Sequence, residues 1–212
     1  SERPLIIAGG GAIYSDARTE LTALAEAFGI PVGETMGGKG AIAGESAMSV
    51  GGAGVTGTAA AGKLMGQADL VISVGTRLGD FATGSHSAFN HPEVKFIGVN
   101  VCGGDSYKLG ALPIIADARE ALKALHKAGT DAGIRPNATY IDEVATVKQS
   151  WQELLESDVF VQYEGEAFNQ LHAIQVINEA AQPGDMILSA AGGPPGDLHQ
   201  LWDTSGGRPC LL

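Results

Sequence analysis

Short apolar runs alternate along the chain with longer segments whose apolar positions recur at helical spacing. The first run, residues 5–8, has no polar interruption, as a strand buried on both faces requires. It leads into Gly9, Gly10 and Gly11, and Ser15 then stands where the N-cap of a helix is expected. The apolar stripe of that helix consists of Ala17, Leu21, Leu24, Ala25 and Phe28. Gly29 supplies a left-handed end, so residues 30–35 are expected to form the second strand.

The same alternation continues as far as residue 128. The expected elements are a helix at 56–68, strands at 69–74 and 94–101, and a helix that begins at the N-cap Asp117. Strands that alternate with helices imply parallel pairing through right-handed crossovers. We therefore expect an α/β fold, a Rossmann-like, doubly wound parallel sheet of about six strands with helices on both faces.

The pattern breaks at residues 129–137, where Gly, Asp, Pro and Asn mark a domain edge. A linker helix is expected at 140–156, followed by a second alternation with a helix at 171–181 and a strand at 185–190. The expected organisation is a first domain at 1–136, a linker helix and connection at 137–170, and the start of a further domain at 171–212. Because the chain opens on Ser1 and stops within an apolar run, we expect it to be a piece of a longer protein.

Charge and composition narrow the classes of function. The chain carries 13 Lys and Arg against 24 Asp and Glu, a net charge of -11, which argues against nucleic acid as a partner. No apolar run approaches the ~18 residues of a membrane span. Cys102 and Cys210 are far apart in the sequence and indicate neither a disulfide framework nor a zinc site. A cytoplasmic setting fits this cysteine usage.

Candidate chemistry lies at two glycine turns. Gly9, Gly10 and Gly11 come between a strand and a helix, where backbone N–H groups can hold a phosphate, although such glycines also serve merely to turn tightly. Gly75 and Arg77 follow the strand at 69–74, and Arg77 offers a planar cation for a phosphate or carboxylate. An ion pair between Arg77 and Asp80 is the more frequent alternative.

No catalytic constellation is visible in the sequence. The histidines show no H-x-x-x-H or H-E-x-x-H spacing, so each is expected at the surface or as a helix cap. They are His86, His91, His126, His172 and His199. Trp151 and Trp202 are expected to anchor helix faces at domain borders.

Four segments nevertheless follow one another in a characteristic order. They are Glu34-Thr-Met-Gly-Gly-Lys-Gly-Ala-Ile42, Gly57-Thr-Ala-Ala-Ala-Gly62, Ala68-Asp-Leu-Val-Ile-Ser-Val-Gly-Thr-Arg77 and Ala116-Asp-Ala-Arg-Glu-Ala-Leu122. This order resembles the central domain of thiamine diphosphate enzymes such as acetolactate synthase. Residues 3–15, 79–83, 99–101 and 190–202 are similar to one branch of that family, the hydrolases that cleave the C–C bond of a cyclic 1,2-diketone, a trihydroxycyclohexane-dione, in inositol catabolism.

The resemblance implies a cofactor site that this chain does not complete. In the family, thiamine diphosphate and Mg²⁺ are held by an N-terminal domain with an activating Glu and a C-terminal domain with a Gly-Asp-Gly…Asn motif. The chain has no Gly-Asp-Gly, so we predict no metal ligand and no catalytic residue in it. Gly192, Gly193 and Pro194 would approach the cofactor in the full enzyme. The expected partners are the missing domains of a homo-oligomeric enzyme and a small-molecule substrate.

Two alternatives stay open. In some relatives the central domain binds FAD or ADP through loops that match Gly9 to Gly11 and Gly75 to Arg77. Those nucleotide binders usually follow the fourth strand with Asp-x-Asp, whereas this chain has Asn100-Val-Cys-Gly-Gly104, which favours a scaffold. The alternatives are an FAD-binding domain of an acetolactate-synthase-like carboligase and a free-standing nucleotide-binding module.

Overall fold

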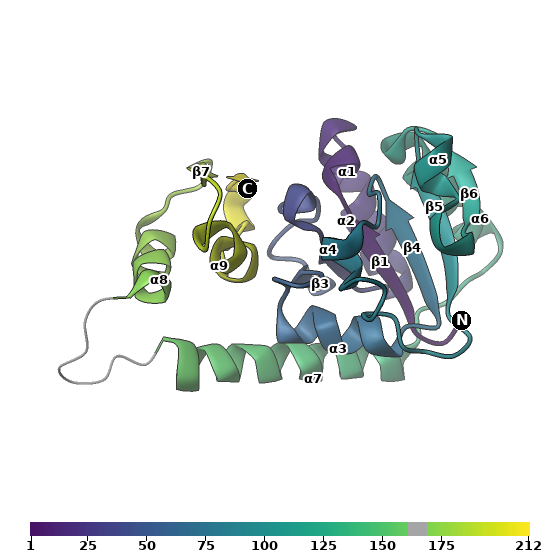
Figure 1. Ribbon diagram of the computed structural model, residues 1–212. Helices are drawn as coiled ribbons and strands as arrows, with labels where there is room; N and C mark the ends of the chain where they lie inside the picture. The colour runs from purple at the N-terminus through teal and green to yellow at the C-terminus, as the bar shows by residue number, and fades with distance from the viewer. Residues whose placement is uncertain (161–168) are drawn as a thin grey trace.

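The computed structural model describes residues 1–160 and 169–212. Within these residues, six parallel strands form the main sheet in the order β3-β2-β1-β4-β5-β6 (Figure 1). The strands are β1 (Pro4–Ala8), β2 (Val32–Glu34), β3 (Ser49–Gly52), β4 (Leu70–Val74), β5 (Lys95–Asn100) and β6 (Leu112–Ile115). Strands β1 and β4 lie at the centre, and the chain adds β2 and β3 on one side and β5 and β6 on the other. The predicted doubly wound α/β sheet is therefore confirmed.

Helices cover both faces of the main sheet. One face packs against α1 (Gly10–Tyr14), α2 (Arg18–Phe28) and α6 (Ala118–Asp131), and the other against α3 (Ala59–Gln67) and α7 (Ala138–Leu154). Because successive strand residues point to opposite faces, Ile6 belongs to the first core and Leu5 to the second. The sheet is therefore buried on both sides, as the uninterrupted apolar strands predict.

Short elements complete the connections of this part. They are η1 (Met36–Gly38), α4 (Asp80–Thr83), α5 (Gly103–Ser106), η2 (Lys108–Gly110) and η3 (Leu155–Val159). We call the strands β1 to β6 with helices α1 to α7 the main unit.

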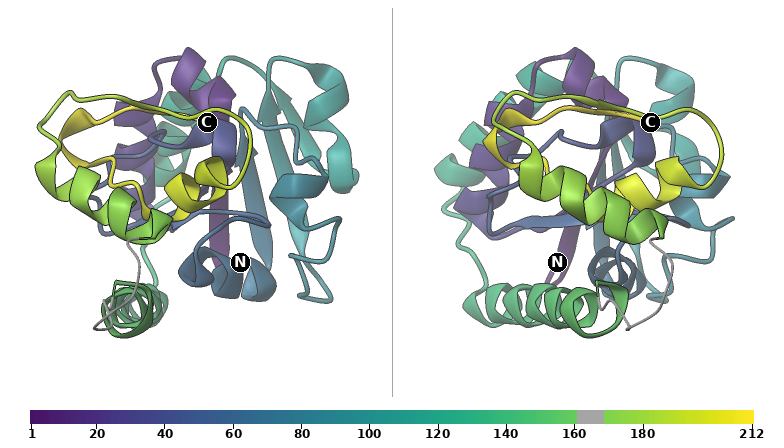
Figure 2. Two further views of the ribbon diagram at one scale, coloured as in Figure 1. Left: turned by 60° about the vertical axis from the view of Figure 1, so that its left-hand side comes forward. Right: turned by 90° about the vertical axis from the view of Figure 1, so that its left-hand side faces the viewer.

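A smaller group of elements follows, which we call the C-terminal unit. It consists of α8 (Gln170–Ala180), β7 (Ile187–Leu188), α9 (Pro194–Leu201), η4 (Ser205–Gly207) and β8 (Cys210–Leu211). Strands β7 and β8 pair in parallel, and the unit lies beside the β3 edge of the main sheet (Figure 2). Trp202 is buried in the core of this unit, whereas Trp151 packs against this core and against the second core of the main unit. Trp151 thus lies where the two units meet, as predicted, whereas Trp202 belongs to the core of the C-terminal unit.

The start of the second helix differs from the prediction. Ser15 is the C-cap of α1 and not the N-cap of α2, which begins after Ala17 without any side-chain cap. The difference arises because the glycine turn continues directly into helix α1, in which the Ser15 N–H donates to the carbonyl of Gly11. At the other end of α2, Gly29 has the predicted left-handed conformation, with φ of 64°.

The described helices include none that is both long and apolar enough to cross a membrane.

Candidate functional site

Two glycine turns meet at the carboxyl ends of β1 and β4, the neighbouring strands at which the strand order reverses. The Gly9 N–H donates to the carbonyl oxygen of Val74 at 2.9 Å, and the Gly11 N–H donates to that of Gly75 at 2.9 Å. The structure thus brings the predicted turn at Gly9, Gly10 and Gly11 into direct contact with the turn that begins at Gly75.

This contact leaves no room for side chains. A Cβ atom on Gly11 would lie 2.7 Å from the Cα of Gly75, and one on Gly9 would lie 2.6 Å from the Gly75 carbonyl oxygen. A Cβ on Gly10 would lie 2.9 Å from the carbonyl oxygen of Gly37, in the loop after β2. Close packing therefore requires these glycines, and hydrogen bonds of the fold already use the N–H groups of Gly9 and Gly11. Phosphate binding by the turn stays a prediction.

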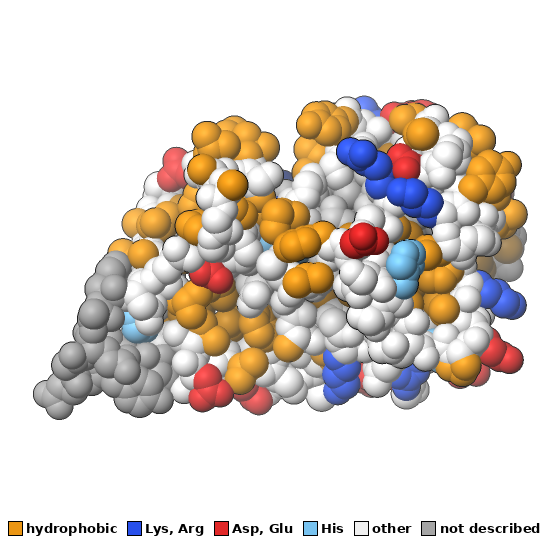
Figure 3. Space-filling view, in the orientation of Figure 1, with side chains coloured by type: hydrophobic (Ala, Val, Ile, Leu, Met, Phe, Trp, Pro, Cys, Tyr) orange, Lys and Arg blue, Asp and Glu red, His pale blue; other side chains and the backbone are white. Residues whose placement is uncertain are grey.

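A cavity of about 300 Å³ opens beside the two turns and is lined in part by Gly11, Tyr14, Asn100 and Val101. The Asn100 amide is engaged locally, because its Nδ2 donates to the carbonyl of Thr76 and its Oδ1 accepts from the N–H of Cys102. Tyr14 is 93 % exposed, and Figure 3 shows hydrophobic patches along the top of the molecule with charged side chains between them. The cavity itself is lined mainly by apolar surface, and the amide of Asn100 in its wall is already engaged.

Arg77 is exposed and follows two residues after Gly75, which lines this cavity. Among the described residues it forms no ion pair with Asp80, so the expected pairing within the loop is not seen. The described residues show no hydrogen bond or ion pair of its guanidinium, and its role as a nucleotide contact stays a prediction.

A second polar cluster lies between the main unit and the C-terminal unit, and sequence analysis missed it. Glu34 ends β2 with only 1 % of its surface exposed, and its Oε1 accepts from the N–H groups of Gly40 at 2.9 Å and Ile42 at 3.2 Å. Lys39, in the same loop, is 5 % exposed. A buried carboxyl and a buried ammonium therefore stand at the carboxyl end of β2, facing the C-terminal unit.

His199 of α9 reaches into this cluster. Its Nε2 lies 2.7 Å from the carbonyl oxygen of Glu34, and its Nδ1 lies 3.1 Å from the Oγ1 of Thr56. The side chain is 1 % exposed. The prediction that every histidine lies at the surface or caps a helix is therefore wrong for His199, and also for His172, which is 5 % exposed.

Burial shifts the protonation equilibria in this cluster. Desolvation lowers the pKa of His199 to about 4, and the charge of Lys39 acts in the same direction. Desolvation also raises the pKa of Glu34, against the opposing effects of Lys39 and of the two backbone N–H donors. Both groups are thus pushed toward their neutral forms.

A cavity of about 260 Å³ lies at the same junction, lined in part by Glu34, Lys39, Lys148 and Asp203. Lys148 is engaged by the fold, because its Nζ donates to the carbonyl oxygens of Ser46 at 3.1 Å and Ala47 at 2.9 Å. The lining of this cavity mixes apolar side chains with acidic and basic groups, so it does not select a ligand of one charge.

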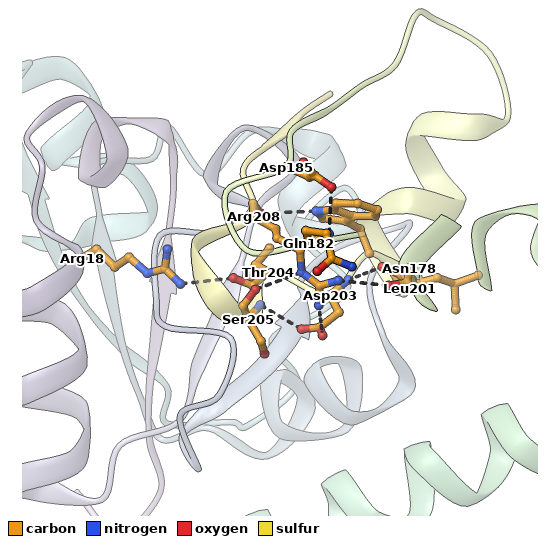
Figure 4. A network of polar contacts seen from close by, with 10 residues as sticks. Arg18, Asn178, Gln182, Asp185, Leu201, Asp203, Thr204, Ser205 and Arg208 are labelled. Carbon is orange, nitrogen blue, oxygen red and sulfur yellow. Dashed lines mark hydrogen bonds and ion pairs between the residues drawn. The ribbon is translucent and has the colours of Figure 1, made fainter. Parts of the chain in front are cut away.

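The junction continues into a network around Arg208 (Figure 4). Arg208 pairs with Asp203, donates to the carbonyl oxygens of Ser205 and Asn178, and lies over the ring of Trp202, 5.6 Å from its centroid. From the main unit, Arg18 donates to the carbonyl oxygen of Thr204 at 3.2 Å. These contacts hold the loop after α9 in place against α2.

The remaining predicted residues lie apart from the glycine turns. Gly192 and Gly193 precede α9, and Pro194 is its first residue, where the fixed φ of proline suits a helix start. All three are exposed. The described residues contain no group of three or more His, Cys, Asp and Glu placed to hold a metal ion.

Comparison with known proteins adds the family context. The model of the thiamine pyrophosphate enzyme central domain matches residues 1–125. The chain is 38% identical to a 3D-(3,5/4)-trihydroxycyclohexane-1,2-dione hydrolase of Halalkalibacterium halodurans and 39% identical to that of Shouchella clausii, with 95% of this chain covered in each. It is 37% identical to the protein of the same name from Bacillus subtilis over 97% of its length. The chain spans 35% of the length of each of these relatives.

Proposed function

The chain belongs to the central-domain family of thiamine pyrophosphate enzymes, and from this we propose that it is the scaffold portion of a hydrolase that cleaves the C–C bond of a cyclic 1,2-diketone in inositol catabolism. The observation that carries the proposal is the 38% identity to a trihydroxycyclohexane-1,2-dione hydrolase across 95% of the chain. That match reaches beyond residue 125, where the central-domain match ends, so it also relates the C-terminal unit to these hydrolases.

We place the scaffold domain at 1–136, a linker at 137–170 and the beginning of the cofactor-binding domain at 171–212. The linker includes residues 161–168, which lie outside the described part. The C-terminal unit supports the last assignment, because parallel strands are normally covered on both faces, whereas Leu188 is 74% and Leu211 is 51% exposed. Further strands and helices of the same domain would cover these side chains.

The residues present do not fit thiamine diphosphate with Mg²⁺. A multiply charged diphosphate needs a metal clamp and oriented donors, and the described carboxylates and histidines offer no such clamp. In the proposed full enzyme, the missing N-terminal and C-terminal domains supply the catalytic residues, thiamine diphosphate and Mg²⁺. Gly192, Gly193 and Pro194 then lie near the cofactor, in a cytoplasmic homo-oligomer.

The alternative is an FAD-binding or ADP-binding central domain. The cavity beside Gly11 and the exposed Arg77 favour it, since both lie at the switch point of the sheet. The engaged Asn100 and the glycine N–H groups already bonded within the fold argue for the scaffold.

Calorimetry on the 212-residue chain tests these assignments. We expect no micromolar binding of thiamine diphosphate with Mg²⁺, FAD or ADP. Micromolar binding of FAD or ADP that is lost in Arg77→Gln would overturn the scaffold assignment alone. Micromolar binding of thiamine diphosphate would show that the cofactor site has been misplaced.

The parent enzyme tests the activity itself. The complete protein should hydrolyse the cyclic diketone when supplied with thiamine diphosphate and Mg²⁺, whereas the 212-residue chain should not. Carboligase activity of the complete protein on pyruvate, without diketone hydrolysis, would favour the acetolactate-synthase-like alternative.

A further inference from the structure

Helix α9 meets the main unit through a histidine whose ring nitrogens both face a partner across the junction. The Nε2 of His199 lies 2.7 Å from the carbonyl oxygen of Glu34, and the Nδ1 lies 3.1 Å from the hydroxyl of Thr56. In the neutral form that burial favours, Nε2 carries the hydrogen because a carbonyl oxygen can only accept, and Nδ1 accepts from the Thr56 hydroxyl. A neutral His199 therefore bridges the end of β2 and the loop between β3 and α3.

Glycines on both units create the space for this bridge. A Cβ on Gly52 would lie 2.8 Å from the Nε2 of His199, and one on Gly196 would lie 3.1 Å from the Cγ2 of Thr56. A Cβ on Gly44 would lie 2.5 Å from the backbone nitrogen of Ser205. Glycines on both sides of the junction thus allow α9 and the loop after it to approach the main unit closely.

The bridge lies in the helix that Pro194 opens. Helix α9 extends from Pro194 to Leu201, so a fixed His199 also fixes the start of the helix and the glycines before it. The loop on the other side of the helix is held separately by the bond from Arg18 to Thr204. Among the described residues, the hydrogen bonds that join the main unit to α9 and to the loop after it are thus those of His199 and of Arg18, and only His199 lies within the helix itself.

We infer that His199 is a positioning residue, which docks α9 on the main unit through Glu34 and Thr56 and thereby sets the place of the Gly192, Gly193 and Pro194 loop. The main unit then fixes the position of the C-terminal unit and does not serve only as a spacer between the other domains. The docking rests on the contacts alone, and only the cofactor-facing role of the loop rests on the proposed function.

Hydrogen exchange on the 212-residue chain tests the docking with variants that differ by single groups. Thr56→Val removes the hydroxyl but keeps the shape, and Thr56→Ser restores the hydroxyl. We expect the α9 amides of residues 198–201 to exchange about tenfold faster in Thr56→Val and in His199→Leu. In Thr56→Val the buried ring nitrogen Nδ1 loses its partner, and in His199→Leu the Glu34 carbonyl and the Thr56 hydroxyl lose theirs. Thr56→Ser should return the α9 amides toward wild-type exchange rates, and the amides of β4 should be unaffected in all variants.

Thr146→Val is the matched control, since the hydroxyl of this exposed threonine on α7 donates within its own helix, to the carbonyl oxygen of Asp142. It should leave the exchange of α9 unchanged. Unchanged α9 exchange in both Thr56→Val and His199→Leu would overturn the docking role. Equal acceleration in β4 and α9 would also overturn it, because the effect would then be a general loss of stability.

A second experiment measures the kinetics of the complete enzyme. In His199→Leu, which removes both the donor for the Glu34 carbonyl and the acceptor for the Thr56 hydroxyl, we expect kcat for diketone hydrolysis to fall more than KM changes. An unchanged kcat would overturn the link to the cofactor-facing loop. An inactive wild-type enzyme would overturn the proposed function instead, and the exchange experiment would still decide the docking role.

Discussion

At the scale of single residues, glycines in this chain differ in what surrounds them. Gly11 is packed on the backbone of Gly75, where an added Cβ would lie 2.7 Å from a Cα atom, whereas a Cβ on Gly62 in α3 would meet nothing within 4 Å. These backbone atoms cannot move aside as the end of a flexible side chain can. The same substitution should therefore have opposite effects at the two positions.

We predict that Gly11→Ala lowers the free energy of unfolding by about 3 kcal/mol through overpacking between β1 and β4. Gly62→Ala should raise it by up to about 1 kcal/mol, because alanine is the better residue in an exposed helix interior. Denaturant titrations of both variants provide the measurement. Similar effects at the two positions would show that the contact between the glycine turns does not limit the fold.

Residue chemistry also explains which parts of the site the sequence could reveal. The glycine turns follow apolar strands directly, so their position is a local signal. His199 gives no local signal, since its partners Thr56 and Glu34 are 143 and 165 positions away. The one hint was Glu34 itself, a carboxylate within the otherwise uncharged strand predicted at 30–35, which indicates a special environment without naming its partners.

At the scale of elements, α6 has a side-chain cap whose removal should be measurable. The carboxylate of Asp117 accepts from the N–H groups of Arg119 at 2.9 Å and Glu120 at 3.2 Å. We predict that Asp117→Ala costs about 1 kcal/mol of unfolding free energy, because these helix donors lose their partner. Asp117→Asn retains an acceptor and should cost less, as measured by thermal melting. Equal losses in the two variants would assign the effect to charge and not to capping.

Elements with regular patterns could be predicted, and those with irregular composition could not. Strand β1 is an unbroken apolar run and β4 is apolar except for Ser73, and both lie within one residue of their predicted ranges. Strand β3 contains two glycines, and β6 contains Pro113, so neither carries the usual strand pattern, although both are edge strands where such residues are tolerated. Helix α1 was missed because glycine is a poor helix former.

At the scale of the whole molecule, two units with separate cores meet at a junction that holds buried ionisable groups. Alternating strands and helices sufficed to predict the main sheet, since the parallel order follows from chirality and short connections. The junction required the tertiary structure, because it joins β2, the loop after β3 and α9. The buried His199 at this junction makes the free energy of unfolding depend on pH.

The pKa of His199 is lowered to about 4 from 6.5, so between these values the unfolded chain binds a proton that the folded chain does not. The free energy of unfolding should therefore rise with pH through this window, and the His199 contribution should be lost as the pH falls toward 4. From about pH 7 to about pH 5, this loss amounts to about 2 kcal/mol.

The titration of Glu34 changes the free energy of unfolding in the opposite sense. Its raised pKa means that the folded chain keeps the proton at pH values above 4.5, the ordinary pKa of the group. The comparison of wild type with His199→Gln cancels this term, since both retain Glu34 and Lys39. Denaturant titrations followed by tryptophan fluorescence should show that wild type loses about 2 kcal/mol more than His199→Gln on going from about pH 7 to about pH 5. Parallel losses in the two proteins would mean that the pKa of His199 is the same in the folded and the unfolded chain, which is incompatible with a neutral, buried bridge between the two units.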